Sequence, residues 1–283
     1  MRRLPCLAVL LASALVASRA AAHDTWLAPR APVDGDAQWT LELTTGHDFP
    51  SLEQAPSLAR VQRAEAITSA AVLPLLPRTP RSDARPFRVL VERGPVVAAV
   101  VALRPATTAL DEAAVARYLA GELGEWPALR ERHRRLGHWR ERYTKNAKSL
   151  LRIDAAGAAP DADGVATRPH GLPYELVPRS DPTRRAPGEA LVVCAFADGA
   201  PVRDPFVPPR IGLVEADGST SWVVAGADGC ATVRPSGIDG YLLRSVLIRP
   251  LDSPLADWDS HFATLTVGSA TARPSTPAEE SSR

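Results

Sequence analysis

Two histidines stand where they could bind a metal ion. His23 directly follows three alanines, residues 20–22, which end a predicted secretory signal. Cleavage after residue 22 would make His23 the first residue, and a terminal histidine offers its α-amine and its ring nitrogen to a metal in one chelate. His47 follows a predicted strand in the segment 46–50 (GHDFP), where Gly46 leaves room for a second imidazole to approach. Because borderline metals favour imidazole nitrogen, we predict a copper or nickel site on His23 and His47.

The other histidines are weaker candidates. His170 lies in a region between two predicted modules, and His261 opens the last predicted strand, so either could add a ligand. His133 and His138 are five positions apart, which is about 140° around a helix, so they do not form the pair of ligands that one helix face provides. We expect both of these to be surface residues.

No catalytic motif is found in the sequence. It contains no nucleophile elbow, no P-loop, no Rossmann glycine pattern and no His-Glu-x-x-His zinc motif. Asp257 and Asp259 flank Trp258, and we interpret them as the solvated entrance of a strand and not as a catalytic pair. The sequence therefore predicts a protein that is not an enzyme, although a copper oxidase built on a terminal-histidine chelate is chemically possible.

The first 22 residues predict export from the cytoplasm. Arg2 and Arg3 precede an apolar run over residues 4–17, which is shorter than the roughly 20 residues of a membrane-spanning helix. We expect a periplasmic or secreted protein with no transmembrane helix after cleavage. The chain has 33 basic and 32 acidic side chains; three arginines lie in the signal, which leaves 30 basic and 32 acidic. This balance gives no basic surface for nucleic acid.

The cysteine count fits a single disulfide. Cys6 lies in the predicted signal, so Cys194 and Cys230 remain as a pair in a compartment where disulfides persist. One bridge between them is the natural prediction, and two free buried cysteines are the alternative. The absence of a Cys-x-x-Cys motif argues against a thioredoxin-like dithiol and against a cysteine zinc site.

The chain divides into two mostly β modules, each interpreted as an antiparallel immunoglobulin-like sandwich. Alternating residues 39–43 and 87–91 and the apolar run 96–103 predict strands. The Ala-, Leu-, Glu- and Arg-rich stretch predicts a helical insertion at about 111–147. The expected boundaries are residues 1–22 for the signal, 23–154 for the first module, 155–170 for a linker, 171–268 for the second module and 269–283 for a disordered tail.

Several short segments resemble a bacterial periplasmic family described as nickel uptake substrate-specific transmembrane region. They occur at residues 23–27 (HDTWL), 46–50 (GHDFP), 141–143 (ERY), 148–152 (KSLLR), 171–178 (GLPYELVP), 257–258 (DW) and 263–266 (ATLT). The resemblance implies an exported two-module β protein associated with nickel or cobalt uptake and without established catalysis. The second module also resembles the small immunoglobulin-like sandwiches of carboxypeptidase-regulatory type, which implies architecture alone.

Two functional hypotheses follow. The first is a periplasmic metal-handling protein that binds nickel or copper for uptake, buffering or delivery to a membrane transporter or another envelope protein. The alternative is a non-catalytic structural or interaction module of the cell envelope, in which the histidines are incidental.

Overall fold

A computed structural model describes residues 24–30, 39–91, 96–153, 160–204, 207–238 and 240–269. The chain is mostly β, as the sequence predicted. Among the described residues, nine strands form one large sheet. In spatial order they are β14 (Thr220–Val224), β13 (Arg210–Val214), β16 (Leu242–Pro250), β17 (Trp258–Ser269), β9 (Trp139–Arg152), β7 (Val96–Leu103), β3 (Val61–Ile67) and β4 (Val72–Pro74), and β8 (Ala106–Leu110) pairs with the first part of β9.

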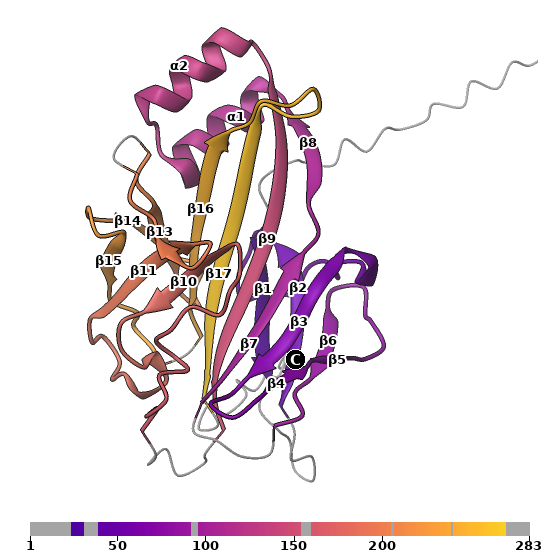
Figure 1. Cartoon of the computed structure of the whole chain (residues 1–283), viewed down its shortest axis with the longest axis vertical. Helices are drawn as coiled ribbons and strands as arrows, with labels where there is room; N and C mark the ends of the chain where they lie inside the picture. The colour runs from indigo at the N-terminus through magenta and orange to yellow at the C-terminus, as the bar shows by residue number, and fades with distance from the viewer. Residues whose placement is uncertain are drawn as a thin grey trace, which may run out of the picture.

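Two smaller sheets cover the large sheet from opposite sides (Figure 1). The N-terminal sheet contains β1 (Asp24–Arg30), β2 (Thr40–Gly46), β6 (Arg85–Arg88) and β5 (Leu76–Pro77). The C-terminal sheet contains β10 (Tyr174–Pro178), β11 (Leu191–Ala197), β12 (Ala200–Pro201) and β15 (Cys230–Val233). Each interface is apolar: Leu176 and Leu265 belong to the core beneath the C-terminal sheet, and Leu41 and Val97 to the core beneath the N-terminal sheet.

The large sheet takes strands from both predicted modules. β9 and β17 lie side by side and parallel over twelve residue pairs, from Trp258 opposite Glu141 to Ser269 opposite Arg152. The other strand pairs are antiparallel among the described residues. This parallel pair joins the two halves of the chain into one continuous sheet. The division into two modules at residues 155–170 stays a prediction.

Helices cover one end of the large sheet, where α1 (Glu112–Tyr118), η2 (Leu119–Leu123) and α2 (Pro127–Leu136) follow one another. Asp111 caps α1 by accepting a hydrogen bond from the Ala114 N–H at 2.7 Å. Gly137, in the left-handed conformation at φ 68°, ends α2. The predicted helical insertion is therefore wrong beyond Leu136, because residues 139–147 belong to strand β9 and pair with β8, β17 and β7.

Beneath these helices lies an aromatic core. Trp139 and Trp258 stack with their ring centroids 4.7 Å apart, and both are buried. Tyr118 packs edge-on against Trp139 at 5.9 Å. The helices thus cover apolar surface of β9 and β17 that the N-terminal sheet leaves uncovered.

Two short 3-10 helices, η1 (Leu58–Arg60) and η3 (Pro182–Arg184), complete the described elements. The described part of the expected linker, residues 160–170, forms turns without strand or helix, yet Val165 and Ala166 are buried in the core beneath the C-terminal sheet. The expected signal and most of the expected tail lie outside the described residues. In the part of the chain that is described, every helix is too short or too polar to span a bilayer.

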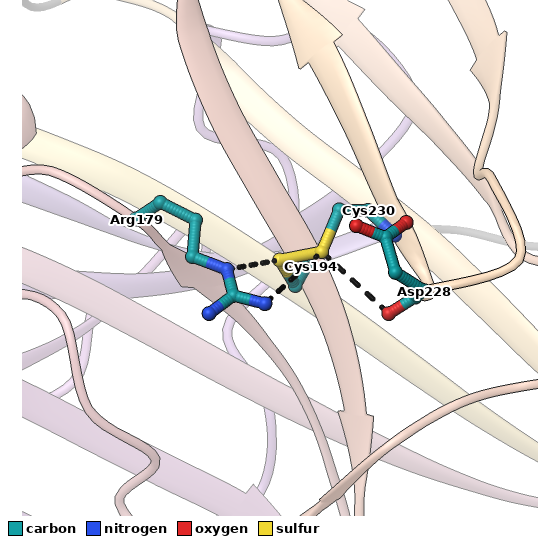
Figure 2. Close-up of a disulfide and its surroundings, with 4 residues drawn as sticks. All are labelled: Arg179, Cys194, Asp228 and Cys230. Atoms are coloured by element: carbon teal, nitrogen blue, oxygen red, sulfur yellow. Dashed lines mark hydrogen bonds between the residues drawn. A yellow bond between two sulfur atoms is a disulfide. The ribbon is translucent and has the colours of Figure 1, made fainter.

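The predicted disulfide is confirmed. Cys194 on β11 is the register partner of Cys230 on β15, and their sulfur atoms are bonded (Figure 2). Neither cysteine belongs to the apolar core beneath the sheet, whereas Val193, Ala195 and Ala231 do. Because side chains alternate along a strand, the bridge lies on the face of the C-terminal sheet that points away from that core.

Candidate functional site

The first described strand pairs with the strand that leads to His47. β1 and β2 are antiparallel, with Asp24 opposite Gly46 and Thr25 opposite Thr45. The Thr25 and Thr45 hydroxyl oxygens lie 2.7 Å apart, so opposite side chains touch at this end of the ladder. His23, the first predicted ligand, lies outside the described residues, and its role stays a prediction.

His47 begins the loop after β2 and keeps 39% of its side chain exposed. Glu53 holds this loop, because its Oε1 accepts hydrogen bonds from the backbone N–H groups of His47 at 2.5 Å and Asp48 at 2.7 Å. Its Oε2 lies 3.7 Å from His47 Nδ1. The Glu53 carboxyl group also fills the space where a Cβ at Gly46 would lie. The room that Gly46 leaves therefore accommodates Glu53, where the sequence suggested an approaching imidazole.

Apolar packing and hydrogen bonds fix the His47 loop and β1 in place. Phe49 of the loop packs edge-on against Trp26 of β1, with ring centroids 5.9 Å apart, and both rings are buried. The Thr264 hydroxyl on β17 donates to the Thr25 carbonyl oxygen at 2.7 Å. β1 is thus held on both sides, by the His47 loop and by β17.

The remaining candidate histidines each contact a different residue. His261 is largely buried, and its Nδ1 lies 2.7 Å from the Thr144 hydroxyl oxygen. His170 is buried beside Glu175. His138 is exposed as expected, but the expectation for His133 is wrong, because its ring lies against Trp139 and is 13% exposed. Within the described ranges, no group of three or more His, Cys, Asp or Glu side chains is placed to hold a metal ion.

The two aspartates around Trp258 serve structure. Asp257 accepts two hydrogen bonds from Arg140, at 3.0 and 2.8 Å, and Asp259 accepts two from Arg142, at 2.9 and 2.8 Å. Both arginines lie on β9, so these ion pairs tie β17 or its entrance to β9. Asp257 is buried, so the interpretation as a solvated strand entrance is wrong for this residue, because its ion pair with Arg140 holds it against β9.

Five charged side chains form a buried charge cluster beside β1, which the sequence did not predict as a site: Asp24, Glu122, Glu141, Lys145 and Arg244. The Asp24 carboxylate lies 2.5 Å from Arg244 Nη1. Glu141 accepts a hydrogen bond from Trp139 Nε1 at 2.7 Å, and among the described residues Glu122 Oε2 is buried without a hydrogen-bond partner. The cluster lies on the face of the large sheet that the helices and β1 cover, at the boundary between the helices and β1.

Burial and mutual charge shift the pKa values of this cluster. Burial, followed by the charge of Asp24, raises the pKa of Glu122 to about 8. Burial lowers the pKa of Lys145 to about 8, although Asp24 and Glu122 favour its charged form. Burial also raises the pKa of Glu141. Groups that titrate near neutrality in a buried cluster are typical both of functional sites and of structural ion networks.

One sequence signal could have indicated the buried charges. The chain contains two lysines, Lys145 and Lys148, against 31 arginines. Both lysines are buried, and Lys148 forms an ion pair with Glu175 at 2.8 Å. An ammonium group can lose its proton in a buried site, whereas a guanidinium stays charged. The two lysines of this arginine-rich chain therefore stand at positions where a buried cation could be suspected.

Comparison with known proteins assigns a family. Residues 20–246 match the model of a family described as a domain of unknown function, DUF4198. The chain belongs to this family. The DUF4198 match includes His23, His47 and every member of the buried charge cluster, and it ends inside β16, before β17.

Other comparisons add little to the DUF4198 assignment. No protein of curated function matches the chain. A solved structure described as "Structural insight into host cell surface retention of a 1.5-MDa bacterial ice-binding adhesin" matches with 9% identity and a TM-score of 0.22. That match covers 88% of this chain and 65% of the adhesin chain. At this TM-score the similarity carries no argument about fold or function.

Proposed function

We propose that the chain beginning at His23 binds one Cu(II) or Ni(II) ion in the cell envelope and buffers it or delivers it to a membrane transporter or another envelope protein. The ligands are the His23 α-amine and ring and the His47 ring. The observation that carries the proposal is the β1–β2 register, in which Asp24 lies opposite Gly46. His23 and His47 are the next residues along these two strands.

Extending this ladder by one pair would bring the two histidines together. Opposite residues of an antiparallel pair have Cβ atoms about 4.5–5.5 Å apart, which allows two imidazoles to reach one ion. Side chains alternate along a strand, so His23 and His47 would share the face on which Thr25 and Thr45 touch. Asp24 would point to the other face, where Arg244 already neutralises it.

Glu53 supports the same assignment. Its carboxylate lies 3.7 Å from His47 Nδ1, so we assign Nε2 as the nitrogen that faces the metal. A carboxylate next to the far nitrogen of a ligating histidine orients the ring and increases its basicity. Two imidazoles and an amine form the nitrogen-rich donor set that Cu(II) and Ni(II) favour.

Isothermal titration with Cu(II) and with Ni(II) tests the proposal on protein that begins at His23. A second protein that begins at Ala22 removes the terminal amine from His23 while keeping every side chain. We expect the extra residue to weaken binding by orders of magnitude and His47→Ala to weaken it by less. Affinity should also fall as the pH falls, because all three nitrogens must be deprotonated to bind.

His138→Ala is the matched control. Its side chain is 49% exposed and lies 3.2 Å from Asp257, so it resembles His47 in exposure and in its carboxylate neighbour. We expect this variant to bind as the unchanged protein does. Equal affinity for the Ala22 form, His47→Ala and His138→Ala would refute the metal site and leave the non-catalytic interaction module as the better account.

A further inference from the structure

The guanidinium of Arg179 contacts both sulfur atoms of the disulfide between Cys194 and Cys230. Arg179, the residue after β10, directs its Nε toward Cys194 Sγ at 3.0 Å and its Nη2 toward Cys230 Sγ at 3.6 Å (Figure 2). Its backbone N–H donates to the Val192 carbonyl oxygen at 2.9 Å, which holds it beside β11. Within the described part of the chain, no carboxylate lies within ion-pair distance of this guanidinium.

The electrostatic attraction between a guanidinium and a disulfide is weak, whereas its attraction to a thiolate is strong. The sulfur of a disulfide is neutral and a weak acceptor, whereas a thiolate carries a full negative charge. A neighbouring cation therefore stabilises the reduced form over the oxidised form, and it makes the nearer sulfur a better leaving group.

The two sulfurs have different surroundings. Cys194 is 0% exposed and lies nearer to the guanidinium, while Cys230 is 8% exposed on β15, an edge strand of the C-terminal sheet. The Asp228 carbonyl oxygen lies 3.6 Å from Cys230 Sγ, on the other side of the bridge from Arg179. After reduction, this oxygen can accept a hydrogen bond from a Cys230 thiol. Cys194 is thus prepared to be a thiolate and Cys230 to be a protonated thiol.

We propose that this bridge is a redox-active site whose reaction partner is a dithiol reductant, such as a protein with two neighbouring cysteines. A thiolate of the reductant attacks Cys230 Sγ, a mixed disulfide forms, the Cys194–Cys230 bond breaks, and Cys194 leaves as a thiolate paired with Arg179. The second thiol of the reductant loses its proton to solvent and attacks its own partner sulfur. Cys230 leaves and takes up a proton.

The exchange balances in electrons and atoms. Two electrons pass from the reductant, which becomes a disulfide, to the cysteine pair. Of the two thiol protons of the reductant, one ends on Cys230 and one in solvent. The result is a C-terminal sheet in which β15 is no longer covalently tied to β11. This site is independent of the proposed metal site, so its test is made in the presence of a chelator.

The first test is the exchange equilibrium with dithiothreitol at pH 7 on the folded protein, with thiols trapped by alkylation and counted by mass. We expect Arg179→Gln to lower the equilibrium constant for reduction by about tenfold, which corresponds to about 30 mV for this two-electron couple. Arg234→Gln is the matched control, because Arg234 is also exposed, directly follows β15 and makes no described contact with either sulfur. An equal constant for the two variants would overturn the proposal.

A second measurement does not depend on the Arg179 variant. In Cys230→Ser, the remaining Cys194 thiol is titrated by its rate of alkylation as a function of pH. We expect it to ionise well below the ordinary cysteine pKa of about 8.5. Ionisation at or above that value, or a bridge in the unchanged protein that dithiothreitol reduces only after unfolding, would assign the disulfide a structural role alone.

Discussion

Asp24 and Arg244 stand 220 positions apart in the sequence, and the Asp24 carboxylate lies 2.5 Å from the Arg244 guanidinium. Asp24 is the first residue of β1, and Arg244 lies on β16 of the large sheet. This pair attaches the start of the described chain to the large sheet. Both residues belong to the buried charge cluster, so the loss of this pair should destabilise the fold.

Arg244→Gln should lower the free energy of unfolding by about 3 kcal/mol or more, because it leaves a buried carboxylate without its partner. The control is Arg142→Gln, whose ion pair with Asp259 is bidentate but has an arginine that is 46% exposed. That change should cost less than about 1 kcal/mol. Denaturant unfolding measures both, and a double variant, Asp24→Asn with Arg244→Gln, should lose less than Arg244→Gln alone.

His170 should make the protein sensitive to acid. Burial lowers its pKa from 6.5, helped by Lys148 and Arg168 and opposed by Glu175. Because the folded-state pKa is lower than the unfolded value, the stability that the neutral ring contributes is present above pH 6.5 and is lost as the pH falls toward the folded pKa. Below pH 6.5, His170→Phe should reduce the slope of unfolding free energy against pH by up to about 1.4 kcal/mol per pH unit.

The control for this prediction is His138→Phe, which removes a histidine that is half exposed. An unchanged slope in His170→Phe would mean that other groups cause the acid sensitivity. His261 is the first of these to examine, since burial lowers its pKa too, although Asp259 opposes the shift.

Two Asp-Gly turns should respond differently to the same substitution. Gly218 and Gly229 have φ values of 82° and 76°, so an alanine at either position adopts a left-handed backbone that costs about 1–2 kcal/mol. A Cβ at Gly218 would meet nothing within 4 Å, whereas at Gly229 it would collide with the Val202 carbonyl oxygen. Gly229→Ala should therefore lower the unfolding free energy by at least about 1 kcal/mol more than Gly218→Ala. Equal losses would show that the Val202 backbone moves freely.

Patterns over neighbouring residues predicted two strands well, whereas the predicted strand at 87–91 is wrong beyond Arg88, where β6 ends. The alternation at residues 39–43 and the apolar run at 96–103 correspond to β2 and β7, because the period of two and the continuous burial are local properties. Residues 139–147 were misassigned, since Arg140, Glu141 and Lys145 favour helix as isolated residues. β9 forms there because strands pair with it on both sides, and tertiary pairing outweighs local preference.

Sequence reasoning could propose only part of the candidate site. His47 could be proposed as a ligand because a histidine after a strand-ending glycine is a local pattern, and its role stays a prediction. The buried charge cluster was not found, because Asp24, Glu122, Glu141 and Arg244 come from four distant segments that only the pairing of β9, β16 and β17 brings together. Glu53 was missed for a similar reason, since its contact with the His47 loop depends on the return path of that loop.

Because β17 lies inside the large sheet, that sheet cannot form fully until this late segment of the chain is available. This strand is the last described one along the chain, yet it lies between β16 and β9 in the middle of the large sheet. During synthesis, one edge of residues 139–152 stays unpaired until residues 258–269 are available to pair with it. Until then an unpaired strand is available to other chains, which is an aggregation risk. Such long-range pairing predicts slow folding and a need for protection of the nascent chain until its final strand emerges.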